Sequence, residues 1–273
     1  EQGAFSNCCS VTSFEIPSSV TSIRNNAFAY CCSLTKITIP SSVKSIQGNP
    51  FVGCINLEQI NVNSRNTEYV SNNSILFTND KRCLIACPPK LNQNEYVIPS
   101  SVTSIGECAF SDCNRLTTIK IPSSVTSIGN FAFSNFCSLT NINIPSSVTS
   151  IGIGAFYNCC SITSIEIPSS VTSIENCTFS DCRKLIHVTI PSSITSIGES
   201  AFSNCCSLPE IEIPSSVKSI GSYALYGCSS ITNLFIPSSV EIIGSDVLSE
   251  CTSLEKLEEE MNDGFIKVTL FSV

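Results

Sequence analysis

The sequence lacks the features that mark several common classes of protein. It has no Trp, one Met and one His, so no histidine cluster is available to hold a metal ion. Only 14 Lys and Arg stand against 22 Asp and Glu, and the net charge of −8 argues against nucleic acid as a partner. Polar residues interrupt every apolar stretch, which excludes a bilayer-spanning segment. No phosphate-cradling glycine motif is present, and no cofactor is implied.

Charged residues make up 13% of the chain, about half the usual share. The surface must therefore consist largely of Ser, Thr and Asn. Because hydrophobic residues reach 42%, the chain can form a core and is not a charged disordered segment.

A short internal repeat dominates the sequence. The string Ile-Pro-Ser-Ser occurs nine times, and its prolines are 23 residues apart except for one gap of 59. These prolines are Pro17, Pro40, Pro99, Pro122, Pro145, Pro168, Pro191, Pro214 and Pro237. Such a period indicates identical structural units that bury one side against their neighbours.

Each unit predicts two strands and a turn. Leu139, Ile142 and Ile144 give the apolar pattern of a strand that ends at the next Pro, which has no N–H to continue a ladder. A second short strand, Val-Thr-Ser-Ile, ends at a glycine such as Gly129, where we expect a positive φ. The remaining Ala-Phe-x-x-Cys predicts one helical or 3₁₀ turn.

Stacking of these units predicts a solenoid of parallel strands, about 50 Å long. One position of the unit then forms a ladder of aromatic rings in the core. Its members are Phe5, Phe28, Phe51, Phe110, Phe133, Phe156, Phe179 and Phe202, followed by Leu225 and Leu248.

The pattern Leu-x-x-Ile-x-Ile-Pro-x-x-Val-x-x-Ile-Gly-x-x-Ala-Phe-x-x-Cys resembles the BspA-like leucine-rich repeat of bacterial and protozoan surface proteins, over essentially the whole chain. The resemblance implies a right-handed, curved solenoid of 23-residue repeats in the β-rich part of the α/β class. It places a parallel β-sheet on the concave face, with short strands and 3₁₀ turns on the convex side. It also implies surface adhesion, although a repeat fold specifies no ligand.

The repeat breaks in two places. Residues 63–98 form an expanded coil, in which 75–77 and 83–86 predict a hairpin with Lys81 and Arg82 at its polar tip. This hairpin is either a tolerated variant of the coil or a protruding binding element. The solenoid is expected to span 1–257, with a cap over 258–273. Because residue 1 lies inside a unit, we expect an exposed first strand that permits self-association.

Sixteen of the eighteen cysteines follow the repeat. Nine share one position of the unit, where a small side chain is expected to be buried in the turn. A neighbouring column brings Cys9 near Cys32 and Cys137 near Cys160, but parallel side chains make disulfides awkward there. Cys83 and Cys87 are the better candidate pair. No zinc-binding spacing recurs, so no metal site is predicted.

Two columns of outward strand residues form the predicted binding surface of the concave face. We assign to it Lys36, Gln59, Lys120, Asn141, Asn143, Glu166, His187, Glu210, Glu212, Asn233 and Phe235. Ser164, His187 and Glu210 fall on consecutive strands, a nominal hydrolase series that lacks an oxyanion hole and a water-excluding pocket. A mildly acidic recognition patch is the favoured interpretation.

We therefore expect a protein-binding module without catalytic residues, located at the cell surface or secreted, that attaches to host extracellular matrix or cell-surface proteins. The alternatives are an intracellular scaffold, favoured by abundant unpaired cysteine, and the hydrolase named above. Glycosylation sequons begin at Asn72 and Asn176, and the hairpin sequon is expected to be the more accessible.

Overall fold

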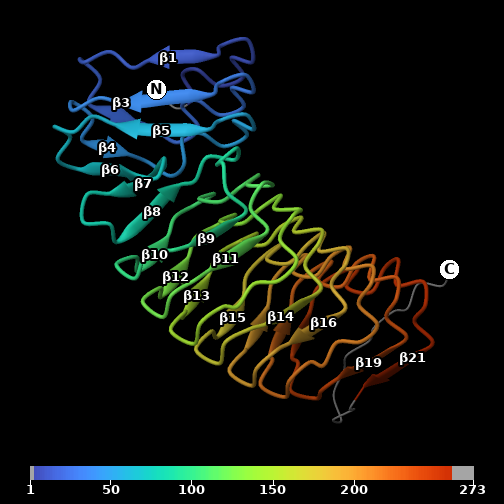
Figure 1. Ribbon diagram of the computed structural model, residues 1–273. Helices are drawn as coiled ribbons and strands as arrows, with labels where there is room; N and C mark the ends of the chain where they lie inside the picture. The colour runs from blue at the N-terminus through green and yellow to red at the C-terminus, as the bar shows by residue number, and fades with distance from the viewer. Residues whose placement is uncertain (1–2, 260–273) are drawn as a thin grey trace.

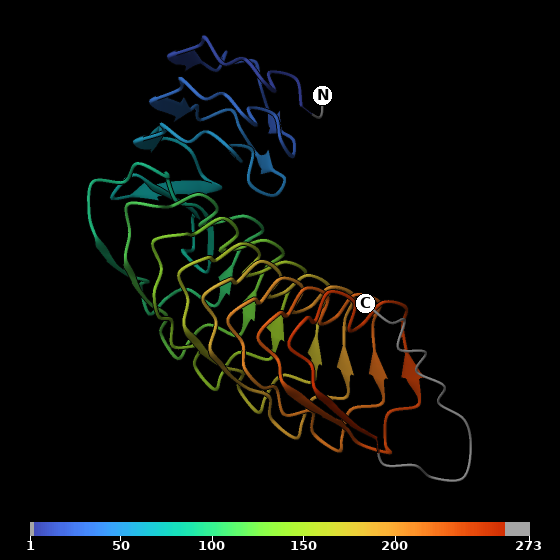
Figure 2. The same ribbon diagram turned by 90° about the vertical axis from the view of Figure 1, so that its right-hand side faces the viewer.

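The computed structural model of the chain describes residues 3–259. It is a solenoid of about ten turns, built from short parallel strands and without a helix in the described part. Figure 2 shows the coils stacked one behind another from the N-terminal to the C-terminal end. The predicted leucine-rich repeat fold, with its repeat of 23 residues, is confirmed.

The longer strand of each coil comes from Leu-x-x-Ile-x-Ile. Neighbouring strands pair in parallel with a shift of one repeat, so that Ser164 lies beside His187 and Glu166 beside Thr189. We call this surface the long-strand face. Its strands are β1 (Ser13–Glu15), β3 (Lys36–Ile39), β5 (Gln59–Val62), β9 (Glu95–Val97), β11 (Thr118–Lys120), β14 (Ser164–Glu166), β16 (His187–Thr189), β19 (Asn233–Ile236) and β21 (Lys256–Glu259).

The Val-Thr-Ser-Ile segments form a second set of strands, of two residues each. Ser104 pairs with Ser127 and Ser127 with Ser150, again one repeat apart. The strands of this short-strand face are β2 (Ser22–Ile23), β4 (Ser45–Ile46), β10 (Ser104–Ile105), β12 (Ser127–Ile128), β13 (Ser150–Ile151), β15 (Ser173–Ile174), β17 (Ser196–Ile197), β18 (Ser219–Ile220) and β20 (Ile242–Ile243).

The Ala-Phe-x-x-Cys segment is a series of hydrogen-bonded turns, not a continuous 3₁₀ helix. Two residues per coil interrupt it in the left-handed region, as Phe131 (φ 53°) and Asn135 (φ 57°) do. A left-handed residue cannot continue a right-handed helix. Alternate N–H groups there reach the next coil, as in the bond from Phe133 N to Ala155 O at 2.8 Å, while those between them bond within their own coil, as Ser134 N does to Phe131 O at 3.0 Å.

The glycine after the short strand is not there to allow a positive φ, as predicted, but to allow close packing of the backbone. Gly129 does not have a positive φ, and the same holds for its counterparts in the repeat. A Cβ on Gly129 would lie 2.8 Å from Glu107 N and from the carbonyl carbon of Gly106. The expectation of a positive φ is therefore wrong. In the coils that have glycine here, the backbones approach too closely for a side chain, whereas Arg24, Gln47 and Glu175 hold the position in three others.

Phenylalanine rings stack through the core in two runs. Phe110 and Phe133 are 5.4 Å apart between ring centroids, and Phe156 lies 5.2 Å beyond Phe133. The run continues to Phe202, whereas a separate run joins Phe5, Phe28 and Phe51 at 5.5 and 5.8 Å. Offset stacking at these distances adds to the stabilisation from burial.

The recurrent cysteine of the turn forms a second internal ladder. The Cys159 thiol donates to Phe133 O at 3.0 Å and the Cys205 thiol to Phe179 O at 3.2 Å, each in the preceding coil. Both side chains are fully buried, and burial raises the pKa of both thiols well above the ordinary value. These cysteines therefore act as small buried donors that satisfy a core carbonyl.

The expanded coil forms three antiparallel strands, β6 (Tyr69–Asn72), β7 (Ile75–Thr78) and β8 (Cys83–Ala86). The predicted hairpin is β7–β8, and β6 was not predicted. Side chains of β7 alternate between two cores, with Phe77 in the larger one and Leu76 in that of the N-terminal coils. The hairpin is therefore a layer between two stacks of coils (Figure 1), not a protruding element. Only its tip is exposed.

Two further expectations about this region are wrong. Cys83 begins β8 and Cys87 directly follows its last residue, which places them about 13 Å apart at the strand rise of ~3.3 Å per residue, too far for a disulfide. Cys87 instead lies beside Cys113, whose thiol contacts Cys87 O at 3.6 Å. Asn72 is only half-exposed, so Asn176 carries the more accessible sequon.

β21 pairs with β19 up to Glu259, so that Glu258 lies beside Phe235 and Glu259 beside Ile236. The rest of the predicted cap, 260–273, lies outside the described residues.

Candidate binding surfaces of the solenoid

The long-strand face places the predicted binding residues in two parallel rows. Lys36 lies between Ser13 and Gln59, and Asn233 lies beside Lys256. The side chains of the predicted residues point away from the core because strand residues alternate between two sides. The predicted residues exposed here are Lys36, Gln59, Lys120, Asn141, Asn143, Glu166, His187, Glu210, Glu212, Asn233 and Phe235.

Within the described residues the ladder of this face breaks at the expanded coil, between β11 and β14, and between β16 and β19. At the position that precedes the last of these breaks, an N–H donates to the preceding coil in most other coils, as Ile186 N does to Thr163 O at 2.9 Å. Pro209 occupies the position here and has no N–H. Within the described residues, the following segment 210–213 pairs with neither neighbour as a strand. Pro209 was not among the predicted site residues, although it departs from the repeat.

A hollow of about 620 Å³ lies at this interruption. Its floor is formed by Val188, Ile211 and Leu234, which are buried, and its rim is polar. Phe235 stands at the rim with 45% of its surface exposed. The lining residues are His187, Val188, Glu210, Ile211, Glu212, Asn233, Leu234 and Phe235. We call it the acidic hollow.

The geometry of this hollow does not favour the hydrolase alternative. His187 Nε2 lies 3.2 Å from Thr189 Oγ1, and this is its one hydrogen-bond contact within residues 3–259. Ser164 lies beside His187 in the strand register, but the imidazole of His187 is hydrogen-bonded to Thr189 and not to the Ser164 hydroxyl. A general base must hydrogen-bond its nucleophile, so the series lacks the first contact that catalysis requires.

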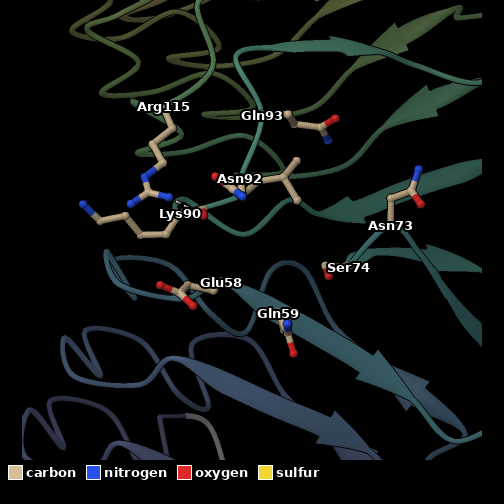
Figure 3. Close-up of a pocket in the computed structure, with 9 residues that line it drawn as sticks. Glu58, Gln59, Asn73, Ser74, Lys90, Asn92, Gln93 and Arg115 are labelled. Atoms are coloured by element: carbon tan, nitrogen blue, oxygen red, sulfur yellow. Dashed lines mark hydrogen bonds between the residues drawn. The ribbon is translucent and has the colours of Figure 1, made fainter.

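A second hollow, of about 570 Å³, lies where the two stacks of coils meet. Figure 3 shows Lys90 and Arg115 together on one side of it and Asn73 with Ser74 on the other. Only Gln59 among its lining residues was predicted. The lining residues are Glu58, Gln59, Asn73, Ser74, Lys90, Leu91, Asn92, Gln93 and Arg115. We call it the junction hollow.

Lys81 and Arg82 lie exposed in the β7–β8 turn. The turn is held by Asp80, whose Oδ1 accepts hydrogen bonds from Thr78 Oγ1 at 2.6 Å and Arg82 N at 3.0 Å. The bond from Thr78 chiefly lowers the pKa of the Asp80 carboxyl. The two basic side chains therefore stand on an ordered turn.

No group of three or more His, Cys, Asp or Glu converges on a metal-sized site within residues 3–259. The same residues contain no helix of the length and apolar character that a membrane span requires.

Comparison with known proteins agrees with this architecture. The family described as "BspA type Leucine rich repeat region (6 copies)" matches residues 1–93, 86–160 and 149–272. A crystal structure of a leucine-rich repeat protein from Eubacterium ventriosum is 31% identical, covers 92% of this chain and 68% of its own, and has a TM-score of 0.84. No curated protein matches.

The pneumococcal vaccine antigen PcpA shares the fold at 21% identity and a TM-score of 0.55, over 96% of this chain and 60% of its own. Proteins built from leucine-rich repeats generally engage in protein interaction, and their solenoid is typically a binding scaffold without enzymatic activity. The repeat pattern, the parallel coils and these matches agree, and the chain belongs to the BspA-type leucine-rich repeat family.

Proposed function

We propose that this chain is a protein-binding module that mediates adhesion at the cell surface through its long-strand face. The acidic hollow carries the proposal. It combines an exposed aromatic ring, Phe235, with the carboxylates of Glu210 and Glu212 over an apolar floor. Aromatic side chains in partly enclosed sites contribute much of the binding energy at protein interfaces.

Exposed polar residues around the acidic hollow would add contacts to a bound partner. Glu166, Asn141 and Asn143 continue the exposed rows toward the N-terminus. Amide and hydroxyl groups repeated at a spacing of ~4.8 Å can bond an extended partner at several points. BspA-type repeat proteins are often found at the surface, which supports a host protein as the partner.

Binding of the whole chain to immobilised collagen, laminin and fibronectin tests the proposal. We expect saturable binding to at least one of them and a loss of about tenfold, or ~1.4 kcal/mol, in Phe235→Ala. Tyr223→Ala is the matched control, because Tyr223 is 40% exposed but lies in the turn away from this face.

Binding to none of the three proteins, or equal losses in the two variants, would refute the proposal. Surface location is tested separately, with antibody against the chain applied to intact cells that produce it. Label that appears only after the cells are permeabilised would contradict the location while leaving the binding result intact.

A further inference from the structure

The junction hollow exists because the expanded coil departs from the repeat. Its walls come from four separate segments: the start of β5, the β6–β7 turn, the loop 90–93, and Arg115 of the following coil. In a regular stack these positions would be filled by the next coil. The hollow is therefore a feature of this junction, which occurs once in the described residues.

The backbone holds these walls in place. Lys90 N donates to Leu57 O at 2.9 Å, which fixes the loop to the N-terminal stack. Ile60 N donates to Ser74 O at 3.3 Å, which fixes the β6–β7 turn to β5. Leu91 is 6% exposed and packs in the core of the C-terminal stack. A ligand would meet a site whose main chain is already ordered, which lowers the cost of binding.

Two cations face this hollow without a carboxylate partner. The guanidinium of Arg115 donates to Lys90 O at 3.4 Å, and Lys90 and Arg115 take part in none of the four ion pairs of the described residues. Glu58 is the one carboxylate of the lining. In a chain of net charge −8, this is a local site for an anion.

The rest of the lining selects the kind of anion. It is formed by carboxamides and a hydroxyl, with Leu91 as its one apolar residue. A carboxamide offers two donors and an acceptor, so it can satisfy a hydroxyl group that both donates and accepts. The members of this set are Gln59, Asn73, Ser74, Asn92 and Gln93. A polyhydroxylated ligand fits this surface better than an apolar one.

From these observations we propose that the junction hollow binds an anionic saccharide, with the sugar carboxylate at Lys90 and Arg115 and the ring hydroxyls at the carboxamides. A volume of about 570 Å³ lies within the range of small-molecule sites. This site is separate from the acidic hollow, and the proposal does not rest on adhesion through the long-strand face.

Titration of the whole chain with methyl β-D-glucuronide and methyl β-D-glucoside, followed by ligand-observed NMR, tests the proposal. The two probes differ at one position, where the glucuronide carries a carboxylate and the glucoside a hydroxymethyl group. We expect the glucuronide to bind at least fivefold more tightly than the glucoside, and at least fivefold more tightly than acetate, which has the charge without the hydroxyls.

Arg115→Gln and Lys90→Gln should each weaken glucuronide binding at least fivefold. Lys184→Gln removes the same charge from an exposed lysine outside the hollow and should leave binding within twofold. A circular dichroism spectrum identical to that of the parent chain shows that each variant is folded.

Several results would overturn the proposal. Equal affinity for glucuronide and glucoside would exclude the carboxylate site, and equal affinity for acetate would reduce it to a simple anion site. Tighter binding of an acidic peptide, acetyl-Asp-Glu-Asp-amide, would assign the hollow to protein. If glucuronide does not bind, or if its affinity is unchanged in both Arg115→Gln and Lys90→Gln, the junction hollow is not a saccharide site.

Discussion

Replacement of Phe156 by Ala tests whether the ring ladder holds neighbouring coils together. Phe156 is fully buried and stacks on Phe133 at 5.2 Å and on Phe179 at 5.5 Å. Truncation of a buried Phe to Ala costs about 3–5 kcal/mol. Because the ring has aromatic partners on both faces, each contributing about 0.5–1.5 kcal/mol, we expect the upper half of that range.

Phe5→Ala is the matched comparison, because Phe5 is 40% exposed at the first coil and stacks in the ladder only on Phe28. We expect a loss of about 1–2 kcal/mol there. Phe156→Leu should cost less than about 1.5 kcal/mol, since Leu225 and Leu248 occupy this position in later coils.

The assay is urea unfolding followed by circular dichroism, with hydrogen exchange to locate the loss. In a stack whose coils contact only their neighbours, protection should fall most in the coils of Phe133 and Phe179 and least at the N-terminal end. A loss below about 1 kcal/mol for Phe156→Ala, or equal losses for Phe156→Ala and Phe5→Ala, would refute this account of the ladder.

Three further predictions follow from the packing between coils. Gly129→Ala should destabilise the fold by about 1–3 kcal/mol, measured by urea unfolding, because the new methyl group meets backbone at 2.8 Å; a neutral effect would contradict the close approach. Burial raises the pKa of Cys54 and Cys182 to about 12, whereas an unfolded thiol ionises near ~8.5. The folded state therefore retains protons that the unfolded state releases, so stability should be complete below about pH 8.5 and fall from there toward pH 12, by at most ~1.4 kcal/mol per pH unit for each thiol. Equal unfolding midpoints at pH 8 and pH 10 under reducing conditions would contradict it. Iodoacetamide should alkylate the exposed Cys9 in the native protein and reach the buried Cys205 only after unfolding; equal rates by mass spectrometry would show that the thiol ladder is open to solvent.

The period of the repeat explains how much of the fold could be predicted. Each residue in a coil has counterparts one repeat away, so Leu139, Ile142 and Phe133 could be assigned to the core from their columns alone. The same columns predicted the exposed rows of the long-strand face. Burial cannot be predicted from equivalent positions where the chain departs from the repeat.

Residues outside the repeat show why the rest could not be predicted. The formation of β6 and the burial of β7 on both sides depend on the position of the expanded coil between two stacks. No other coil in the described residues has an equivalent segment from which this position could be predicted. Lys90 and Arg115 are ordinary loop residues in the sequence and meet only through the junction. Pro209 was visible as a break in the pattern, but its effect depends on the ladder bond that it removes.

The thiol ladder also bears on how chains of this kind can change in length. Each thiol donates to the coil before it and leaves the corresponding carbonyl of its own coil for the coil after it, as Cys182 bonds Phe156 O and Cys205 bonds Phe179 O. Every coil with the turn cysteine therefore presents the same acceptor at one end and the same donor at the other. A duplication or deletion of one whole 23-residue unit rejoins matching partners, whereas one of any other length misaligns the thiols, the rings and the glycines together. The packing of such an array is thus compatible with lengthening or shortening by whole coils.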